Sequence, residues 1–410
     1  MSPNFRSFGN GSEEIFYGIL LSERLKKKIL FIYPRLGILS IANQELYYLE
    51  HENIISHKSS LSITFGVLFE IYVLILWFID FIKCSSITKT LFTLFGLKNS
   101  QFIKKDFGYI IPTIGKEKLW VPAGNNKFCS KNALNLNWSK QYKNFQPPKI
   151  NANKLEIGNN FLFDLGLPKN QWFVCLHVRE RKNKNEVRNA EIKNYIKAIN
   201  YIISKGGFVI RIGDPDSPKL PKMKNLIDYA NSKNRTPLID LVILSNCNFI
   251  LGTGSGPNMA AHLFDRKVIG SNLTEWSHSI SFCKISILKH FRSKKENKIL
   301  SIREMLNAPY HIQRVGNYPH KDYELIDNSP EEIELLVKSQ LESLGQNLKS
   351  QFQQEFDRIK IRQLLKHLDE GDIKNWYGLT KYEYLTQQYR FFALSMYEGV
   401  VEKNFLDRNW

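Results

Sequence analysis

Between residues 150 and 272, short apolar runs alternate with segments of helical spacing. The apolar runs occupy 171–178, 208–213, 247–252 and 267–272, and each is followed by polar or glycine-rich residues. Apolar positions recur at helical spacing in 190–204, 222–232, 236–245 and 257–264. Nearly continuous apolar strands that alternate with helices predict a parallel sheet covered by helices on both faces.

The N-terminal part carries a weaker version of the same pattern. Residues 28–34 (KILFIYP) form a short apolar run closed by proline. Gly37 follows it and precedes helical spacing from Ile38 to Leu49. A strand, a glycine turn and a helix make up one half of a βαβ unit, so we expect a second α/β domain here.

Composition shifts divide the chain. Residues 138–150 carry paired prolines and little periodicity, which is typical of a linker. We therefore expect an N-terminal domain at 1–150, a C-terminal α/β domain at 151–350 and a charged, mostly helical extension at 351–410. Residues 328–332 (NSPEE) predict a helix start, because they offer a cap, a first-turn proline and first-turn acids.

One segment raises the question of a membrane. Residues 61–84 are long enough to span a bilayer, but Glu70 and Asp80 interrupt them and leave only Ile71 to Ile79 uninterrupted. The short uninterrupted run favours a buried helix of a globular domain. An interfacial helix beside the basic cluster at 24–28 and a transmembrane helix are the alternatives.

The composition and the net charge limit which kinds of binding partner are expected. The 410 residues, 43% hydrophobic and 13% aromatic, suffice for two domains with well-filled cores. The formal net charge of +18 favours an acidic partner such as nucleic acid, anionic lipid or a phosphorylated substrate. The basic residues are dispersed and show no nucleic-acid-binding motif, so we expect no nucleic-acid partner.

The cysteines and the N-terminal residues indicate in which cellular compartment the protein is expected. No two cysteines form a C-x-x-C pair, so we expect reduced thiols and no zinc site. The N-terminal residues lack a basic region followed by an apolar one, so secretion is not expected. The five cysteines are Cys84, Cys129, Cys175, Cys247 and Cys283.

Polar side chains and glycines follow each predicted strand of the C-terminal domain. Because the carboxyl ends of parallel strands meet at one edge of a sheet, we expect these groups to converge there. Arginine side chains, serine hydroxyls and the amides of a helix N-terminus suit a diphosphate. The residues, in strand order, are His177, Arg179 and Glu180; Arg211, Gly213 and Asp214; Thr253, Gly254, Ser255, Gly256 and Asn258; and Ser271 and Asn272.

Each of these features also has an ordinary structural explanation. Glycine-rich turns between a strand and a helix occur for packing alone. A hydrogen-bonded structural role competes with a functional one for His177, and metal ligation is not expected without a second ligand nearby in sequence. Arg188 in its Lys- and Asn-rich loop, and Glu45 in the N-terminal helix, are compatible with solvated charges.

Taken in order, several motifs resemble a family of bacterial glycosyltransferases often linked with surface polysaccharide gene clusters. They are HVR at 177–179, VRN at 187–189, GGFVIRIGD at 206–214, Asp240 and CNFILGTGSG at 247–256. The family is more distantly similar to fucosyltransferase-type enzymes. The resemblance is strong over about 170–290, and Ile38, Val187 and Gly254 depart from the family pattern.

The resemblance implies a GT-B-like fold of two Rossmann-like domains with a helical C-terminal extension. It implies that Arg179, Arg211 and the Ser255–Gly256 turn bind the diphosphate of a nucleotide-sugar, with His177 and Arg188 nearby. We expect a metal-independent enzyme that needs no further cofactor and transfers a sugar to a glycan or lipid-linked acceptor.

Glu45 and Glu180 are the candidate bases for the acceptor hydroxyl. We expect a cytoplasmic protein, with a peripheral contact to the inner face of the cell membrane as an open alternative. A sugar-nucleotide epimerase of the same fold and a non-catalytic basic binding protein are the competing hypotheses.

Overall fold

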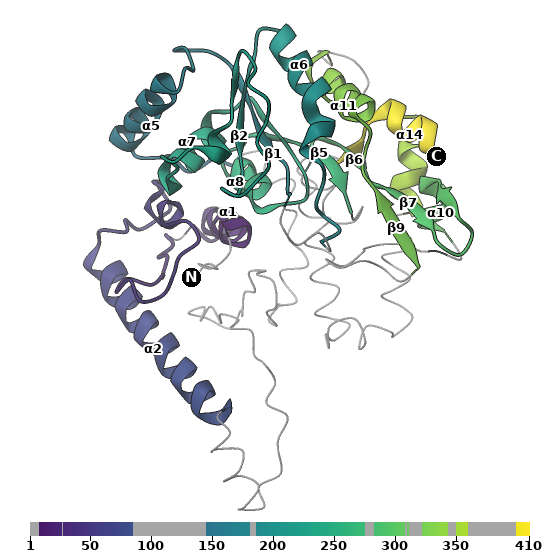
Figure 1. The fold of residues 1–410 in the computed structure, drawn as a ribbon. Helices are drawn as coiled ribbons and strands as arrows, with labels where there is room; N and C mark the ends of the chain where they lie inside the picture. The colour runs from purple at the N-terminus through teal and green to yellow at the C-terminus, as the bar shows by residue number, and fades with distance from the viewer. Residues whose placement is uncertain are drawn as a thin grey trace, which may run out of the picture. The chain divides into compact units, whose positions relative to one another are not determined.

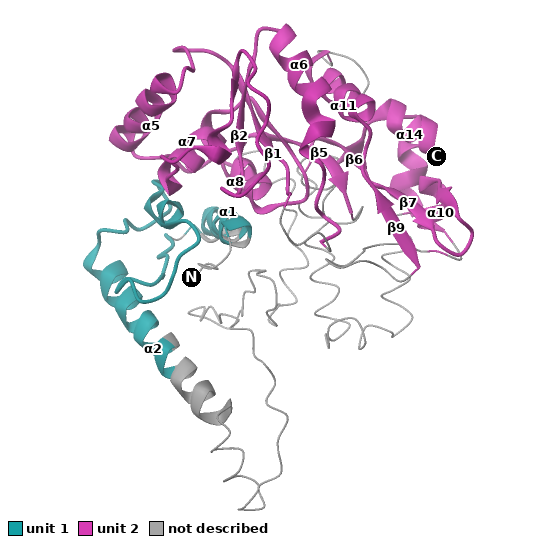
Figure 2. Ribbon diagram, in the orientation of Figure 1, with its two compact units in different colours: residues 1–130 teal, residues 131–410 magenta. Residues whose placement is uncertain are grey.

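The computed structural model describes residues 8–26, 28–84, 145–180, 186–274, 283–307, 310, 322–342, 350–359 and 399–410. The chain divides into two compact units, Met1–Ser130 (unit 1) and Lys131–Trp410 (unit 2), which are coloured separately in Figure 2. The linker expected at 138–150 falls within unit 2, and the division into three domains stays a prediction.

A sheet of seven parallel strands forms the centre of unit 2 (Figure 1), in the order β3-β2-β1-β4-β5-β6-β10. The first six strands follow the order of Rossmann-type doubly wound sheets. The predicted parallel sheet is therefore confirmed. The strands are β1 (Phe173–His177), β2 (Phe208–Ile212), β3 (Leu226–Ile227), β4 (Phe249–Gly252), β5 (Lys267–Leu273), β6 (Ile285–Leu288) and β10 (Val400–Val401).

Helices cover both faces of this sheet (Figure 1). On one face α6 (Ile196–Ser204) packs against α11 (Pro330–Glu342). On the other face α7 (Pro237–Asn246) contacts α8 (Gly256–Leu263) and also α5 (Ala152–Asp164). The chain moves in one direction along the sheet from β1 through α6 to β2, and in the opposite direction from β3 through α7 to β4. Right-handed crossovers in these two directions place the helices on opposite faces.

Local sequence explains where these helices begin and end. The Thr236 hydroxyl accepts a hydrogen bond from the Ile239 amide at 3.2 Å, and Pro237 occupies the first turn of α7. Behind α6, Gly206 adopts a φ of +82°, which favours glycine at a helix end. Gly207 follows it against the Trp172 ring, where an added Cβ would lie 2.4 Å from a ring carbon.

Two expectations for unit 2 are corrected. The predicted helix at 222–232 is instead strand β3 followed by the 3-10 helix η4 (Tyr229–Asn231). Asp228 accounts for this break, because its carboxylate accepts hydrogen bonds from Leu220 and Asn231. The predicted helical extension is helical at 353–359 and in α14 (Lys403–Asn409), but β10 adds a strand to the main sheet, and 360–398 lie outside the described residues.

A second, antiparallel sheet follows the Rossmann-type part of unit 2. Its order is β8-β7-β9, built from His290–Ser293 (β7), Lys298–Leu300 (β8) and Tyr323–Ile326 (β9). A short helix, α10 (Ile302–Leu306), follows β8 behind a reciprocal capping box between Ser301 and Glu304. The alternating pattern at 150–272 gave no sign of this sheet.

Unit 1 differs from the expected α/β domain. Its described residues form α1 (Phe8–Leu25), the 3-10 helix η1 (Gln44–Tyr48) and α2 (Ser60–Cys84). Within 8–26 and 28–84, the predicted strand at 28–34 is reduced to one isolated parallel bridge between Ile29 and Ile54. The predicted helix from Ile38 to Leu49 is reduced to η1, and residues 85–144 lie outside the description.

The segment 61–84 is helical, as predicted, but the described part of α2 is not a buried helix. Most of its large apolar side chains up to Ile75 are exposed. No helix within the described residues is long and apolar enough to cross a membrane. Three cysteines, Cys175, Cys247 and Cys283, are buried free thiols, whereas the side chains of Cys84 and Cys129 lie outside the description.

Candidate functional site

The strand order of unit 2 identifies one point on the sheet edge. From β1 the chain moves through α6 to β2 on one side, and from β3 it crosses back through α7 to β4 on the other. The carboxyl ends of β1 and β4 therefore mark the topological switch point, where ligands of doubly wound sheets bind. The residues that follow these two strands are the His-Val-Arg segment and the glycine-rich turn.

His177 and Ser255 meet at this point. The His177 Nε2 atom lies 2.9 Å from the Ser255 hydroxyl, and Nδ1 lies 3.4 Å from the Ile212 carbonyl oxygen. Burial lowers the pKa of His177 to about 4, so the ring is neutral at pH 7. A neutral ring satisfies both contacts only when Nδ1 donates to Ile212 and Nε2 accepts the Ser255 hydroxyl proton.

The glycine-rich turn presents backbone amides at the N-terminus of α8. Within the described part of the chain, the amides of Gly254, Ser255 and Gly256 have no hydrogen-bond acceptor, and all three residues are half-buried. Because the Ser255 hydroxyl is engaged with His177, it does not cap α8. A helix start with open amides attracts anions, and proline in its first turn removes a donor that would be unsatisfied anyway.

Buried polar contacts fix the shape of this turn. The Asn258 side chain donates to the Thr253 carbonyl at 2.8 Å, and the Thr253 hydroxyl accepts from the Arg179 amide at 3.1 Å. An added Cβ on Gly252 would lie 2.4 Å from the Asn258 Oδ1 atom. Thr253 and Asn258, both predicted donor-binding residues, are therefore placed to hold the turn in shape.

Glu186 joins the two arginines that the sequence singled out. Its carboxylate pairs with the Arg179 guanidinium at 2.6 Å and also forms an ion pair with Arg188. The Arg179 and Glu186 side chains are 10% and 12% exposed, whereas that of Arg188 is 29% exposed. Burial alone would raise the pKa of Glu186, but the two guanidinium groups outweigh it and hold that pKa below its ordinary value.

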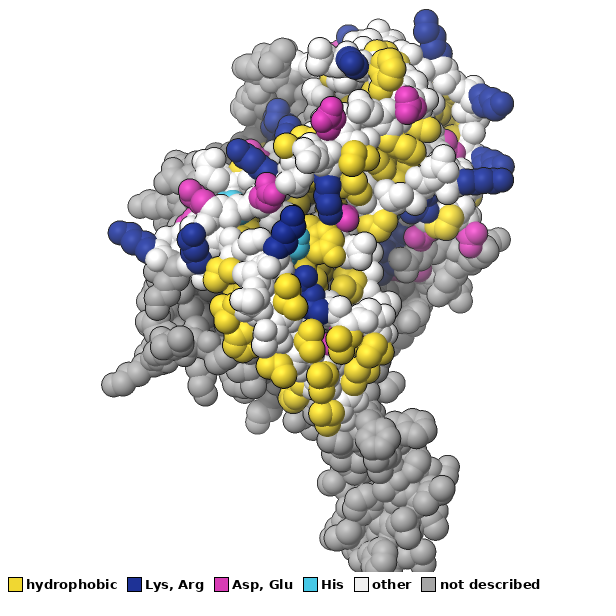
Figure 3. Space-filling model, turned by 90° about the vertical axis from the view of Figure 1, so that its left-hand side faces the viewer, with side chains coloured by type: hydrophobic (Ala, Val, Ile, Leu, Met, Phe, Trp, Pro, Cys, Tyr) yellow, Lys and Arg dark blue, Asp and Glu magenta, His cyan; other side chains and the backbone are white. Residues whose placement is uncertain are grey.

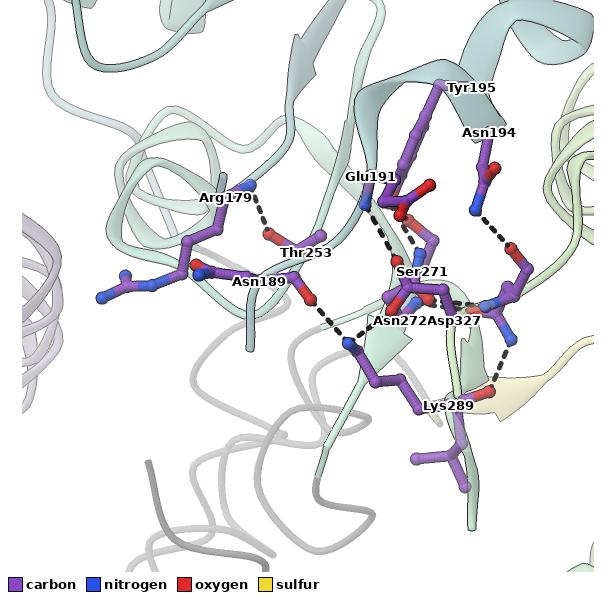
Figure 4. A network of polar contacts seen from close by, with 12 residues as sticks. Arg179, Asn189, Glu191, Asn194, Tyr195, Thr253, Ser271, Asn272, Lys289 and Asp327 are labelled. Carbon is purple, nitrogen blue, oxygen red and sulfur yellow. Dashed lines mark hydrogen bonds and ion pairs between the residues drawn. The ribbon is translucent and has the colours of Figure 1, made fainter. Parts of the chain in front are cut away.

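A polar network anchors the loop that carries Glu186 and Arg188 (Figure 4). The Lys289 ammonium, almost completely buried, donates to the Asn189 carbonyl at 2.5 Å and pairs with Asp327 at 2.6 Å. The Glu191 amide donates to the other Asp327 oxygen at 2.9 Å. The backbone just after Arg188 is therefore tied to the end of β6 and to the turn before α11.

The same network closes the ends of β5 and α6. Asn272 and Asn328 exchange amide-to-side-chain hydrogen bonds, both of 2.7 Å, and the Asn272 side chain also donates to the Tyr195 hydroxyl at 3.0 Å. The Tyr195 hydroxyl lies 2.8 Å from that of Ser271. Ser271 and Asn272, which the sequence placed at the ligand edge, are thus buried parts of the scaffold.

Two further predicted residues bind backbone groups of unit 2. The Arg211 side chain is completely buried and bonds to the Pro218 carbonyl and to Asp228 at 3.4 Å, so it holds the loop after β2. The Glu180 carboxylate accepts a hydrogen bond from the Ile192 amide at 3.2 Å. Burial raises the pKa of Glu180 above its ordinary value, which suits a proton acceptor at neutral pH.

Asp214 and Gly213 end β2 beside this site. Asp214 is exposed, and its charge acts on His177 to favour the protonated ring. Asp214 and Asp216 also form a D-x-D sequence, so metal independence stays a prediction. Among the described residues, no three His, Cys, Asp or Glu side chains are grouped so that they could hold a metal ion.

The structure thus brings His177, Arg179, Arg188, Ser255 and the turn amides together in unit 2. Glu45 lies in the first turn of η1 in unit 1, and its role as a base stays a prediction. Sequence reasoning missed Glu186, Lys289 and Asp327. An acid between two arginines was visible in the sequence, but Glu186 sits in a basic loop that was interpreted as solvated.

No protein-family model matches the chain, and no curated protein matches it. Among solved structures, it is similar to a glycosyl transferase family 9 protein of Veillonella parvula, with 11% identity, a TM-score of 0.26, and coverage of 30% of this chain and 36% of that one. A second is the Escherichia coli ADP-heptose LPS heptosyltransferase II, with 12% identity, a TM-score of 0.25, and coverage of 30% and 38%.

A third is the iron-containing dodecameric glycosyltransferase TibC of enterotoxigenic E. coli, with 17% identity, a TM-score of 0.23, and coverage of 50% and 49%. The matches span less than half of each of these three solved chains. All three are glycosyltransferases by name. We draw no conclusion about activity from similarities at such low scores.

Proposed function

We propose that the chain is a glycosyltransferase whose unit 2 binds a nucleotide-sugar donor at the carboxyl ends of β1 and β4. The observation that carries the proposal is that, at the switch point of a doubly wound sheet, three amides without described acceptors follow β4, and Arg179, which follows β1, shares Glu186 with Arg188. A diphosphate is the ligand that uses both sets of donors. The nucleotide-sugar part of the proposal comes from the motif resemblance.

Glu186 bears on how such a donor would bind. Its carboxylate pairs with both Arg179 and Arg188 and balances one of their two positive charges, and it offers the two-oxygen geometry that a phosphate also offers. A diphosphate entering this edge competes with Glu186 for the guanidinium groups. We therefore assign Glu186 the role of an internal counter-ion that holds the arginines in place and yields them to the ligand.

The chemistry follows from where charge develops. As the glycosidic bond of the donor breaks, negative charge accumulates on the leaving nucleoside diphosphate, and preorganised amides and guanidinium groups stabilise it. The acceptor hydroxyl, on a glycan or lipid-linked molecule, attacks the anomeric carbon and loses its proton to a base. Glu180 and Glu45 are the proposed bases. His177 serves by orienting Ser255, because its low pKa keeps the ring neutral.

A thermal-shift screen with UDP, GDP, ADP and their sugar conjugates tests donor binding. Arg179→Ala removes a bidentate charged contact, so we expect about tenfold to hundredfold weaker binding by calorimetry. Arg292→Ala removes an arginine whose side chain is 40% exposed and pairs with Glu324, and it is the matched control. Failure of every nucleoside diphosphate to stabilise the protein, or unchanged binding in Arg179→Ala, refutes the proposal.

Product analysis separates the transferase from its alternatives. A transferase forms glycosylated product only when an acceptor is present, whereas an epimerase converts the donor alone. A non-catalytic binding protein forms neither product. Repeating the assay with EDTA and with added Mg²⁺ or Mn²⁺ tests the predicted metal independence.

A further inference from the structure

Helix α2 exposes a broad apolar face. Between Ser60 and Ile75 its exposed large apolar side chains are 42–58% accessible to solvent. In Figure 3 hydrophobic side chains gather over this part of the molecule. At about 100° per residue, six of them fall within an arc of about 120°. These six, called the α2 apolar face below, are Leu61, Phe65, Leu68, Ile71, Tyr72 and Ile75.

The opposite face of α2 is the one that the protein buries, and it is polar. Ser62 and Glu70 are 1% and 0% exposed, and Gly66 lies between them. An added Cβ on Gly66 would lie 2.4 Å from the Arg35 side chain and 2.7 Å from the Tyr33 carbonyl oxygen. The Arg35 guanidinium donates to the Ser62 hydroxyl at 2.8 Å. The usual amphipathic arrangement is therefore reversed.

Glu70 fixes this reversed orientation. Its carboxylate accepts hydrogen bonds from four backbone amides of the loop around Gly37: Arg35 at 2.7 Å, Ile38 and Leu39 each at 2.9 Å, and Leu36. A rotation of α2 that buried its apolar face would leave these amides and the carboxylate without partners, at a cost of several hydrogen bonds to a charged group. The exposed apolar face is thus a specified feature of unit 1.

The exposure is concentrated in this part of the chain. Nine of the twelve exposed large hydrophobic residues in the described structure lie between residues 36 and 75. Two of the nine, Leu36 and Ile38, belong to the loop that binds Glu70. Soluble surfaces rarely keep so many large apolar side chains together unless the patch contacts a partner or a membrane.

Charge and shape favour a bilayer over a protein partner. Lys26, Lys28 and Lys58 are exposed, and Lys58 lies two residues before the start of α2. The segment that begins at Lys28 contacts the first turn of α2, where the Ser62 hydroxyl donates to the Phe31 carbonyl at 3.5 Å. An apolar arc of about 120° is also wider than the a/d seam of a coiled coil. Aromatic side chains and nearby lysines are typical of helices that lie in a membrane interface.

We infer that α2 lies in the interface of a bilayer with anionic headgroups, its apolar face among the acyl chains and the nearby lysines at the phosphates. Glu70 holds the helix in the orientation that this contact requires. The inference rests on unit 1 alone and does not depend on the transfer reaction. It gives unit 1 a peripheral attachment surface.

Vesicle flotation of the full-length protein tests the inference. The probes are vesicles of phosphatidylcholine alone and of phosphatidylcholine mixed with phosphatidylglycerol, at low and high salt. We expect binding to the anionic vesicles that weakens with salt. Leu68→Ser with Tyr72→Ser should lower the partition coefficient by about tenfold or more, because two apolar side chains leave the interface.

Matched variants distinguish the α2 apolar face from other exposed apolar side chains. Ile157→Ser with Phe163→Ser removes two equally exposed apolar side chains from α5 and should leave binding unchanged. Lys26→Glu with Lys58→Glu should lower binding to anionic vesicles about tenfold while circular dichroism stays unchanged. Absence of wild-type binding to any vesicle, or equal binding by the α2 and α5 variants, overturns the inference. A third outcome is that the wild type binds no vesicles but self-associates as its concentration rises, and that Leu68→Ser with Tyr72→Ser abolishes this self-association. That result would assign the α2 apolar face to a second copy of the chain.

Discussion

The two units use apolar side chains in opposite ways. In unit 2 every residue of β1 and β4 is buried, and polar groups gather where the strands end. In unit 1 the described part of α2 buries Ser62, Gly66 and Glu70 and exposes its apolar face. Hydrophobic periodicity therefore locates the core of unit 2, whereas in unit 1 the position of one acid decides which face of the helix points inward.

The same contrast appears in two buried carboxylates. Glu70 accepts hydrogen bonds from four backbone amides of one loop. A ligand could replace this carboxylate only if the loop unfolded. Glu186 is bound by two arginine side chains at the edge of the sheet, which can exchange one anion for another. We therefore expect Glu70 to be structural and Glu186 to be displaceable, and the predictions below are ordered by the size of effect that this difference implies.

The largest effect is expected for Glu70→Ala. The substitution leaves four amides without their acceptor, so we expect unit 1 to lose on the order of 3 kcal/mol of stability. Hydrogen exchange by mass spectrometry should show faster exchange in the peptide that covers 35–39. Glu52→Ala, at an exposed position of the same unit, is the control. Unchanged protection in Glu70→Ala would mean that the carboxylate does not hold the loop.

As the pH falls, unit 2 should lose stability before unit 1 does. The pKa of His177 falls from 6.5 to about 4 on folding, so its contribution is complete above pH 6.5 and is lost as the pH falls toward 4. At full effect this is on the order of 3 kcal/mol in unit 2. Burial alone would raise the pKa of Glu70, but its amides lower it, so that contribution persists to below pH 4.5.

Hydrogen exchange measured from pH 7 to pH 4, corrected for the intrinsic rate, checks this order. Peptides of β1 and α8 should lose protection before the peptide that covers 35–39. In His177→Gln the early loss in unit 2 should be smaller. Simultaneous loss in both units would contradict the assignment of the two groups.

A smaller effect is expected for Asn328→Ala. The completely buried Asn328 side chain accepts from the Asn272 amide and donates to the Leu288 carbonyl, each at 2.7 Å. Removing it leaves two buried groups unsatisfied, so we expect a loss of about 2 kcal/mol in urea unfolding. Asn246→Ala, which removes an exposed bond to Asn159, should cost less than about 0.5 kcal/mol. Equal unfolding midpoints would show that the network adds no stability.

The smallest effect on stability is expected for Glu186→Gln. Glutamine keeps the size of the side chain and removes the charge that competes with a ligand anion. We expect the unfolding free energy to change by less than about 1 kcal/mol, whereas nucleoside diphosphate affinity rises several-fold. Weaker binding in Glu186→Gln would mean that the carboxylate contacts the ligand or positions the arginines in a way that the amide cannot reproduce.

Sequence patterns predicted unit 2 well because its strands are buried on both faces. The runs that contain Val174, Val209, Ile250 and Val268 are nearly continuously apolar, so the strands and the edge where their carboxyl ends meet were predicted. The strand order, and with it the switch point, came from the structure. The prediction failed where one side chain redirects the backbone. Asp228 draws the Leu220 amide and the Asn231 side chain to itself, and the expected helix at 222–232 does not form.

The helix expected from Ile38 to Leu49 in unit 1 also failed because a carboxylate side chain binds backbone amides, but here that side chain is distant in sequence. Glu70 accepts from the amides of Arg35, Leu36, Ile38 and Leu39, so the expected first turn of a helix becomes an amide loop. No local pattern reveals an acceptor more than thirty residues away. Within the candidate site, Arg179 and Ser255 were predicted from the strand ends, whereas Glu186 depends on a loop anchored by Lys289 and Asp327.

Calorimetric titration of UDP, GDP and ADP into wild type, Arg179→Ala and Glu186→Gln tests the central claim most directly. The claim is that Arg179 and Arg188, which follow β1, and the amides of the turn after β4 form a diphosphate site whose internal counter-ion is Glu186. It predicts that one nucleoside diphosphate binds the wild type, binds about tenfold to hundredfold more weakly to Arg179→Ala, and binds several-fold more tightly to Glu186→Gln. Equal affinities for all three proteins, or no binding to any, would contradict it.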